Sequence, residues 1–168
     1  MNSIPLAIIN PYADSRPDDV AIDTIVIHSM FAEGQKNQFD CDSCHLTLIQ
    51  HQVSAHYYIG QDGQVFASVP EKLRAWHAGK SKMPFPDDQR EVINDFSIGI
   101  ELLGDSAIGF SEAQYLSLIL LIQNISRLHP ISAIVGHDQI APGRKTDPGD
   151  LFDWNRLKTE FKKQYRFN

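Results

Sequence analysis

Cysteine is scarce in this sequence: the 168 residues contain only two, in the stretch Cys41-Asp42-Ser43-Cys44-His45. The spacing matches the C-x-x-C-H pattern of covalent haem attachment, which requires export to an oxidising compartment. A two-cysteine zinc half-site would need a second C-x-x-C, and the sequence has none. We therefore expect two reduced thiols where a polar loop enters a helix.

The sequence also lacks long apolar runs and a positive charge excess. No stretch reaches the ~18 apolar residues of a membrane span, and the start Met1-Asn2-Ser3-Ile4 leads into neither the basic region nor the apolar core of a signal peptide. The net charge of −6 and the absence of a basic patch argue against a nucleic-acid partner. These features predict a cytoplasmic protein with no membrane or nucleic-acid partner, and we expect a monomer.

The remaining pattern predicts one α/β domain, residues 1–168, with a central mixed β-sheet flanked by helices. A chain of this length buries roughly 70% of its unfolded surface. Apolar runs, the Asp62-Gly63 turn and a Ser111/Gln114 capping box define the elements. We predict strands over 24–29, 56–59, 64–69, 96–103 and 131–135, and helices over 42–52, 111–128 and 152–165. Residues 1–20 and 80–94 are expected to be irregular, and 73–79 fit no element.

Two histidines end apolar strands, His28 after Thr24–Ile27 and His137 after Ile131–Gly136. A loop stiffened by Pro and Gly then leads to Asp147. Two imidazoles and a carboxylate leave the fourth position of a zinc ion open for water, which is a catalytic arrangement. A hydrogen-bonded strand-end histidine and a turn aspartate before Pro148 would explain the same residues without a metal.

Glu101 and Lys145 are the other candidates for chemistry. Glu101 interrupts the apolar strand 96–103, on the face opposite Ile98 and Ile100, and a buried carboxylate is costly unless it is paired or functional. Near a metal it would accept a proton from water, and Lys145 would stabilise an oxyanion. A solvent-facing strand glutamate and a solvated loop lysine are the alternatives.

Four ordered motifs resemble those of the zinc-dependent N-acetylmuramoyl-L-alanine amidases. They are Val53-Ser54-Ala55-His56, Arg74-Ala75-Trp76-His77-Ala78-Gly79, Asn94 through Leu102, and Gly136-His137 through Lys145-Thr146-Asp147-Pro148-Gly149. The similarity extends over about residues 12–160. It is greatest to the cytoplasmic branch that acts on 1,6-anhydro-N-acetylmuramoyl-L-alanine in bacterial cell-wall recycling.

The resemblance implies a role for each motif. Zinc ligands would be His28, His137 and Asp147, the catalytic residues Glu101 and Lys145, and the segment Trp76, His77, Ala78 and Gly79 would line the substrate groove. The implied fold is shared with phage amidases and peptidoglycan recognition proteins. The implied reaction is zinc-dependent hydrolysis of the amide between the muramoyl lactyl group and L-alanine of a muropeptide.

Three positions depart from that branch: Ser29 replaces a usual asparagine, Gln52 an arginine and Leu103 an acid. We expect these changes near the groove, where they bear on which muropeptide is preferred. An amidase acting on polymeric peptidoglycan is therefore a second hypothesis. A non-catalytic peptidoglycan-binding module is a third, although such relatives typically lose a zinc ligand and this chain keeps all three positions.

Overall fold

A mixed six-stranded sheet forms the centre of the computed structural model, which describes residues 2–105 and 107–168. The strand order is β1-β5-β4-β7-β3-β8, with β4, β7, β3 and β8 parallel and β5 antiparallel to β4. The elements are β1 (Ile4–Pro5), β2 (Ala13–Ser15), β3 (Thr24–Met30), α1 (Cys41–Gln50), β4 (Tyr57–Ile59), β5 (Val65–Ala67), β6 (Leu73–Ala75), η1 (Ile93–Asp95), β7 (Ser97–Leu103), α2 (Glu112–Leu128), β8 (Ala133–Gly136), α3 (His137–Ile140) and α4 (Trp154–Phe161). The predicted mixed sheet flanked by helices is confirmed.

The two longest strands, β3 and β7, lie side by side in the middle of the sheet and are covered on both faces. Their register pairs Ile27 with Ile100 and His28 with Glu101. Side chains alternate between the two faces of a strand. Ile27 and Ile100 therefore point into one core, while His28 and Glu101 share the opposite face.

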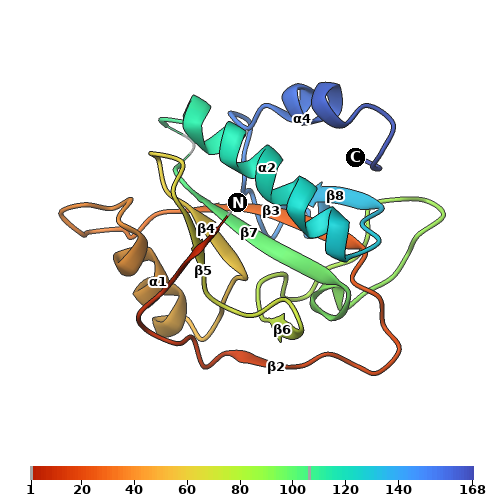
Figure 1. Cartoon of the computed structure of the whole chain (residues 1–168), viewed down its shortest axis with the longest axis horizontal. Helices are drawn as coiled ribbons and strands as arrows, with labels where there is room; N and C mark the ends of the chain where they lie inside the picture. The colour runs from red at the N-terminus through yellow and green to blue at the C-terminus, as the bar shows by residue number, and fades with distance from the viewer. Residues whose placement is uncertain (1, 106) are drawn as a thin grey trace.

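Helix α2 covers the first of these faces and lies roughly along the direction of β7 (Figure 1). Its N-terminus carries the predicted capping box, in which Ser111 Oγ accepts from the Gln114 amide and the Gln114 side chain accepts from the Ser111 amide. Helix α4 packs against the same core. The apolar side chains joining helices to sheet include Leu118, Ile122, Leu157, Phe161, Ile27, Ile98 and Ile100.

The opposite face carries two smaller cores with polar residues between them. Helix α1 packs there through Cys44 against Tyr58 and Leu103. Met83, Phe85 and Ile93, from the long 80–94 segment, form the other core with residues of β3, β8 and α3. His28 and Glu101 emerge from the sheet in the region flanked by these cores.

Several predicted boundaries were wrong. Residues 1–20 contain β1 and β2, and β2 pairs with β6 in a separate two-stranded ribbon. The guanidinium of Arg74 supports this pairing by donating to both carboxylate oxygens of Asp14. Because the ribbon depends on a charged pair, it leaves no apolar pattern in the sequence. His137 begins the short helix α3, and α4 is shorter than predicted.

No helix within residues 2–105 and 107–168 combines the length and apolar character that crossing a membrane demands.

Candidate metal centre and catalytic cleft

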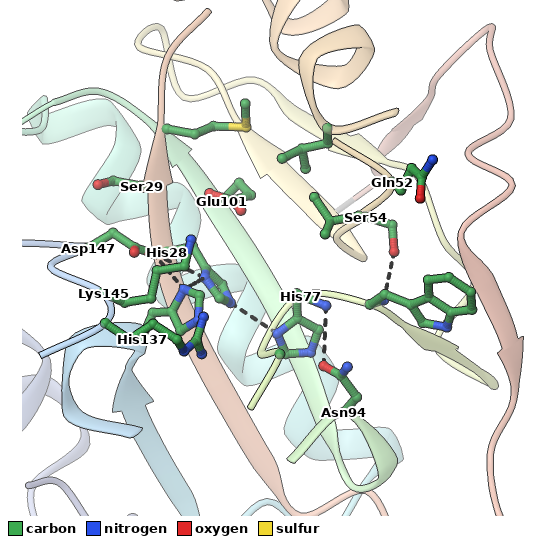
Figure 2. A pocket seen from close by; sticks show the side chains of 16 residues that line it. His28, Ser29, Gln52, Ser54, His77, Asn94, Glu101, His137, Lys145 and Asp147 are labelled. Atoms are coloured by element: carbon green, nitrogen blue, oxygen red, sulfur yellow. Dashed lines mark hydrogen bonds and ion pairs between the residues drawn. The ribbon is translucent and has the colours of Figure 1, made fainter. Parts of the chain in front are cut away.

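A cleft of about 320 Å³ opens on the sheet face that carries α1. Figure 2 shows His28, His137, Asp147 and Lys145 gathered at one end, with Gln52 and Ser54 at the other. A second hollow of about 410 Å³ continues from the first along Ser29, Lys145 and Asp147. The cleft therefore has an extended form with a cluster of titratable side chains on its floor.

Three atoms converge at that cluster, one each from β3, α3 and the loop after α3. His28 Nδ1 lies 2.9 Å from His137 Nδ1. Asp147 Oδ2 lies 3.1 Å from His28 Nδ1 and 3.0 Å from His137 Nδ1. Both imidazoles are almost fully buried, at 2% and 4% exposure. The structure thus brings together the three residues that the sequence predicted as metal ligands.

The donor set fits a zinc ion. Ligands at 2.0–2.1 Å from a tetrahedral zinc lie roughly 3.3 Å apart, close to the three observed separations. His137 Nε2 lies 3.2 Å from the Ala78 carbonyl oxygen and donates to it in the neutral ring. Its Nδ1 then carries no proton, and its lone pair faces the Asp147 carboxylate. Because both groups are hydrogen-bond acceptors, a cation between them is favoured.

The protonation states agree with this reading. Burial, together with the neighbouring His137, lowers the pKa of His28 to about 4, which keeps the imidazole neutral as a ligand must be. Burial raises the pKa of Asp147, but the contacts with His137 and His28 outweigh it and hold that pKa far below the usual range. Asp147 is therefore an anion that lies against the two imidazoles.

Glu101 lies beside this cluster on β7. Its side chain is 6% exposed, and its Oε2 has no hydrogen-bond partner among the residues that the structure describes. Burial and the negative charge of Asp147 raise the pKa of Glu101 well above the ordinary value, with Lys145 acting in the opposite direction. A buried carboxyl group open to the cleft is suited to exchanging a proton with a bound molecule.

Lys145 lies at the cleft edge in an exposed position of the loop between α3 and Asp147. The preceding residue, Arg144, anchors this loop by donating to the carbonyls of Ala78 and Lys80 at 2.7 and 2.8 Å. The Asp138 amide also donates to the Asp147 carbonyl at 2.8 Å. The loop is thereby closed on itself, which keeps His137, Lys145 and Asp147 close together.

The segment 76–79 divides between the cleft and the protein interior. Trp76, His77 and Gly79 line the cleft, whereas Ala78 is fully buried. Both ring nitrogens of His77 contact protein atoms, His28 Nε2 at 3.0 Å and Ser97 Oγ at 3.1 Å. Substrate binding by this segment stays a prediction.

Asn94 lies within one of the family motifs, and its structural role was not predicted from the sequence. Its Oδ1 accepts from the backbone amides of His77 and Ala78 at 3.2 and 2.8 Å. Asn94 therefore fixes the segment that lies against both histidines of the cluster. An amide side chain just before a strand carries no signal of such a contact in sequence alone.

The positions that depart from the family pattern are not all in the cleft. Ser29 and Gln52 line it, as expected. Leu103 is fully buried in the core beneath α1, so its expected place near the groove is wrong. Cys41 and Cys44 are buried free cysteines in α1, outside the residues that line the cleft.

A mixed sheet with an open His-His-Asp cluster and a neighbouring buried glutamate is typical of metal-dependent hydrolases. The model of the N-acetylmuramoyl-L-alanine amidase family matches residues 14–150 of this chain. The chain belongs to that family.

Individual relatives agree with this assignment. The 1,6-anhydro-N-acetylmuramyl-L-alanine amidase AmpD of Escherichia coli (strain K12) is 35% identical over 92% of this chain and 91% of its own length. AmpD of Haemophilus influenzae is 37% identical over 91% and 90%. A third relative, the N-acetylmuramoyl-L-alanine amidase AmiD of Escherichia coli, is 38% identical over 70% of this chain and 48% of its own.

Solved structures give the same result. The crystal structure of a selenomethionine AmpD derivative superposes with a TM-score of 0.78 at 35% identity, covering 94% of this chain and 93% of the other. AmiD from Escherichia coli, solved in complex with anhydro-N-acetylmuramic acid-L-Ala-D-gamma-Glu-L-Lys, gives 0.69 at 34% identity, covering 86% and 60%. A complex of peptidoglycan recognition proteins shares the fold, with a TM-score of 0.68 at 19% identity and coverage of 100% and 99%.

Proposed function

We propose that this protein hydrolyses the amide between the lactyl group of N-acetylmuramic acid and L-alanine in muropeptides, with a preference for the 1,6-anhydro sugar. The observation that carries the proposal is the convergence of His28, His137 and Asp147 in a cleft that also holds Glu101 and Lys145. The relatives named for the anhydro substrate support the sugar preference. The process to which we assign this reaction is bacterial cell-wall recycling.

His28, His137 and Asp147 would hold a zinc ion through two Nδ1 atoms and one carboxylate oxygen. Zinc bound in this way polarises a carbonyl group and lowers the pKa of water toward neutrality. The three side chains come from the central strand β3, helix α3 and one closed loop, so the protein fixes their directions before substrate arrives. Such preorganisation reduces the rearrangement needed during the reaction.

Glu101 is proposed as the proton carrier. Its carboxylate removes a proton from the attacking water as the oxygen bonds to the lactyl carbonyl carbon. It then delivers that proton to the nitrogen of L-alanine as the carbon–nitrogen bond breaks. The products are the free muramic acid carboxylate and a peptide with an N-terminal amine. Burial raises the pKa of Glu101, which brings proton exchange nearer to neutral pH.

Lys145 is proposed to stabilise the negative charge that develops on the carbonyl oxygen. Its ammonium group lies at the same end of the cleft as His28 and His137 (Figure 2). A positive charge next to the developing oxyanion stabilises the transition state, and Lys145 is placed at the edge of the cleft to provide it. The substrate itself would lie along the cleft-facing side of segment 76–79, where Trp76 offers an aromatic surface that is 38% exposed.

The proposed substrate is tested by mass spectrometry of the products from two substrates under one condition. Purified protein is incubated with soluble anhydromuramoyl-tripeptide and, separately, with intact peptidoglycan. We expect free tripeptide and anhydromuramic acid from the first and much slower release from the second. Preferential release from intact walls would support the alternative amidase acting on polymeric peptidoglycan.

A single domain comprising residues 1–168, acting as a monomer in the cytoplasm, completes the proposal. The six-stranded sheet joins strands from β1 at Ile4–Pro5 to β8 at Ala133–Gly136, which supports the single domain. Two buried free thiols are compatible with a reducing compartment. Light scattering of the purified protein tests the monomer, and cell fractionation tests the location.

A further inference from the structure

The outward-facing nitrogens of both proposed histidine ligands meet the same two-residue segment. His137 Nε2 lies 3.2 Å from the carbonyl oxygen of Ala78. His28 Nε2 lies 3.0 Å from Nδ1 of the His77 ring. A ligating histidine almost always donates its second N–H to an acceptor, which fixes its tautomer and orientation. Here one acceptor is a carbonyl and the other is a second imidazole.

His77 is itself held firmly. Its Nε2 lies 3.1 Å from Ser97 Oγ at the start of β7, and its ring is 7% exposed. Asn94 Oδ1 accepts from its backbone amide. Figure 2 shows the His77 ring between His28 and Asn94 on the floor of the cleft. The ring therefore has little freedom to turn away from His28.

The sheet provides space for this ring at a single glycine. A Cβ atom built on Gly99 would lie 2.5 Å from Cγ of His77, far inside van der Waals contact. Gly99 is on β7 two residues before Glu101, on the same face of the strand. The absence of a side chain at position 99 thus allows His77 to lie against the strand and reach His28.

The number of protons in this chain of contacts settles the direction of each hydrogen bond. With Nδ1 of His28 directed at the metal position, its single proton is on Nε2. His77 Nδ1 must then be the acceptor, its own proton is on Nε2, and Ser97 Oγ accepts it.

We propose that His77 is a positioning residue, which accepts the Nε2–H of His28 and so holds the Nδ1 of His28 toward His137 and Asp147. The proposal rests on the zinc site of the proposed function. It differs from the groove-lining role that the family resemblance implies for His77, because it acts through a zinc ligand and involves no contact with substrate. Loss of this acceptor should weaken metal binding as well as turnover.

The test measures zinc affinity by competition with a chromophoric chelator for wild type, H77Q and H77L. Glutamine retains one acceptor and one donor, whereas leucine has neither. We expect about 10- to 100-fold weaker zinc binding for H77L, with H77Q closer to wild type. The matched control is H45Q, because His45 is also buried and hydrogen-bonded, but to Tyr58 and the Ile8 carbonyl. Wild-type zinc affinity in a folded H77L would overturn the proposal.

A second measurement needs no variant and no substrate. Long-range ¹H–¹⁵N spectra of the zinc-loaded wild type report which ring nitrogen of each histidine carries a proton. We expect protonated Nε2 and bare Nδ1 on His77, and protonated Nε2 on His28. The opposite tautomer of His77 would overturn the proposal even if H77L fails to fold. If zinc binds with these tautomers but the muropeptide is not cleaved, the proposed function fails and the positioning role stands.

Discussion

His28 and Glu101 face each other across the two central strands, β3 and β7, and project from the same face of the sheet. One is a proposed metal ligand and the other the proposed proton carrier. The parallel pairing of β3 and β7 therefore sets the distance between the His28 and Glu101 side chains, and no loop is involved. Because both positions are buried, their geometry is as rigid as the core that surrounds them.

Replacement of Glu101 by Gln should separate catalysis from metal binding. The amide keeps the size of the side chain but cannot carry the proton, so we expect kcat to fall by about 100- to 10,000-fold. Zinc content, measured by atomic absorption, should stay at the wild-type level. The control is Glu112→Gln, which removes an exposed carboxylate paired with Arg156. Near-normal turnover by the Glu101 variant would contradict its assigned role.

Lys145→Met should also spare the metal site. Methionine preserves much of the length of the side chain but removes the charge, and loss of one oxyanion-stabilising group costs about 100- to 1,000-fold in kcat. Steady-state kinetics with anhydromuramoyl-tripeptide give the result. The account is wrong on this point if kcat is unchanged and only KM rises, since that pattern indicates uniform binding of substrate and transition state.

Gly99→Ala should destabilise the fold through a specific clash. The added Cβ would overlap the His77 ring, and forced overpacking of a core costs about 1–3 kcal/mol. The His77→Ala background removes the ring, so the same substitution should cost less there. A double-mutant cycle based on urea unfolding measures this coupling. Additive effects of the two substitutions would show that the predicted contact is unimportant.

Acid should destabilise the metal-free protein through its buried histidines. Burial and the nearby Arg16 lower the pKa of His56 to about 3 in the folded state, against about 6.5 when unfolded. Between these values the unfolded chain binds one more proton. The free energy of unfolding therefore falls as pH drops, by about 1.4 kcal/mol per pH unit for each such histidine.

Urea unfolding of chelator-treated protein between about pH 7 and about pH 5 checks this slope. His56→Gln should make it shallower by about one proton, whereas His51→Gln, at an exposed position, should leave it unchanged. Parallel slopes for wild type and His56→Gln would mean that His56 does not change its protonation on unfolding.

Both thiols should react slowly in the native protein. Burial, with Cys44 adding to the effect on Cys41, raises the pKa of each cysteine to about 12. Only the thiolate reacts with disulfide reagents. We expect negligible labelling of folded protein at about pH 8 and labelling of both residues in denaturant. Rapid labelling of the native state would indicate an open or strained α1.

The central strands and helix α2 were predictable because burial leaves a clear periodic pattern. Both central strands carry buried isoleucines, Ile25 and Ile27 on β3 and Ile98 and Ile100 on β7, and the capping box at Ser111 marks the helix start. The ribbon of β2 and β6 could not be predicted in the same way. It depends on a charged pair, Arg74 with Asp14, that is distant in sequence.

The candidate site likewise has a part that was predictable from the sequence and a part that was not. Strand ends and loop spacing suggested that His28, His137 and Asp147 would meet. The sequence context also singled out Glu101 and Lys145 as candidates for chemistry, and the family motifs assigned the same roles. The outer contacts were not predictable, because the links of His77 to His28 and of Asn94 to residues 77 and 78 join elements that are distant in sequence. Only the folded backbone brings such polar pairs together.

The most direct test of the account is a zinc-dependence measurement on one protein preparation. Release of free tripeptide from anhydromuramoyl-tripeptide is followed by mass spectrometry before chelation, after chelation and after stoichiometric zinc is restored, with His137→Ala alongside. The account predicts that activity is lost and regained with zinc, and that His137→Ala lacks both metal and activity. Undiminished tripeptide release by the metal-free protein, or by His137→Ala, would contradict it.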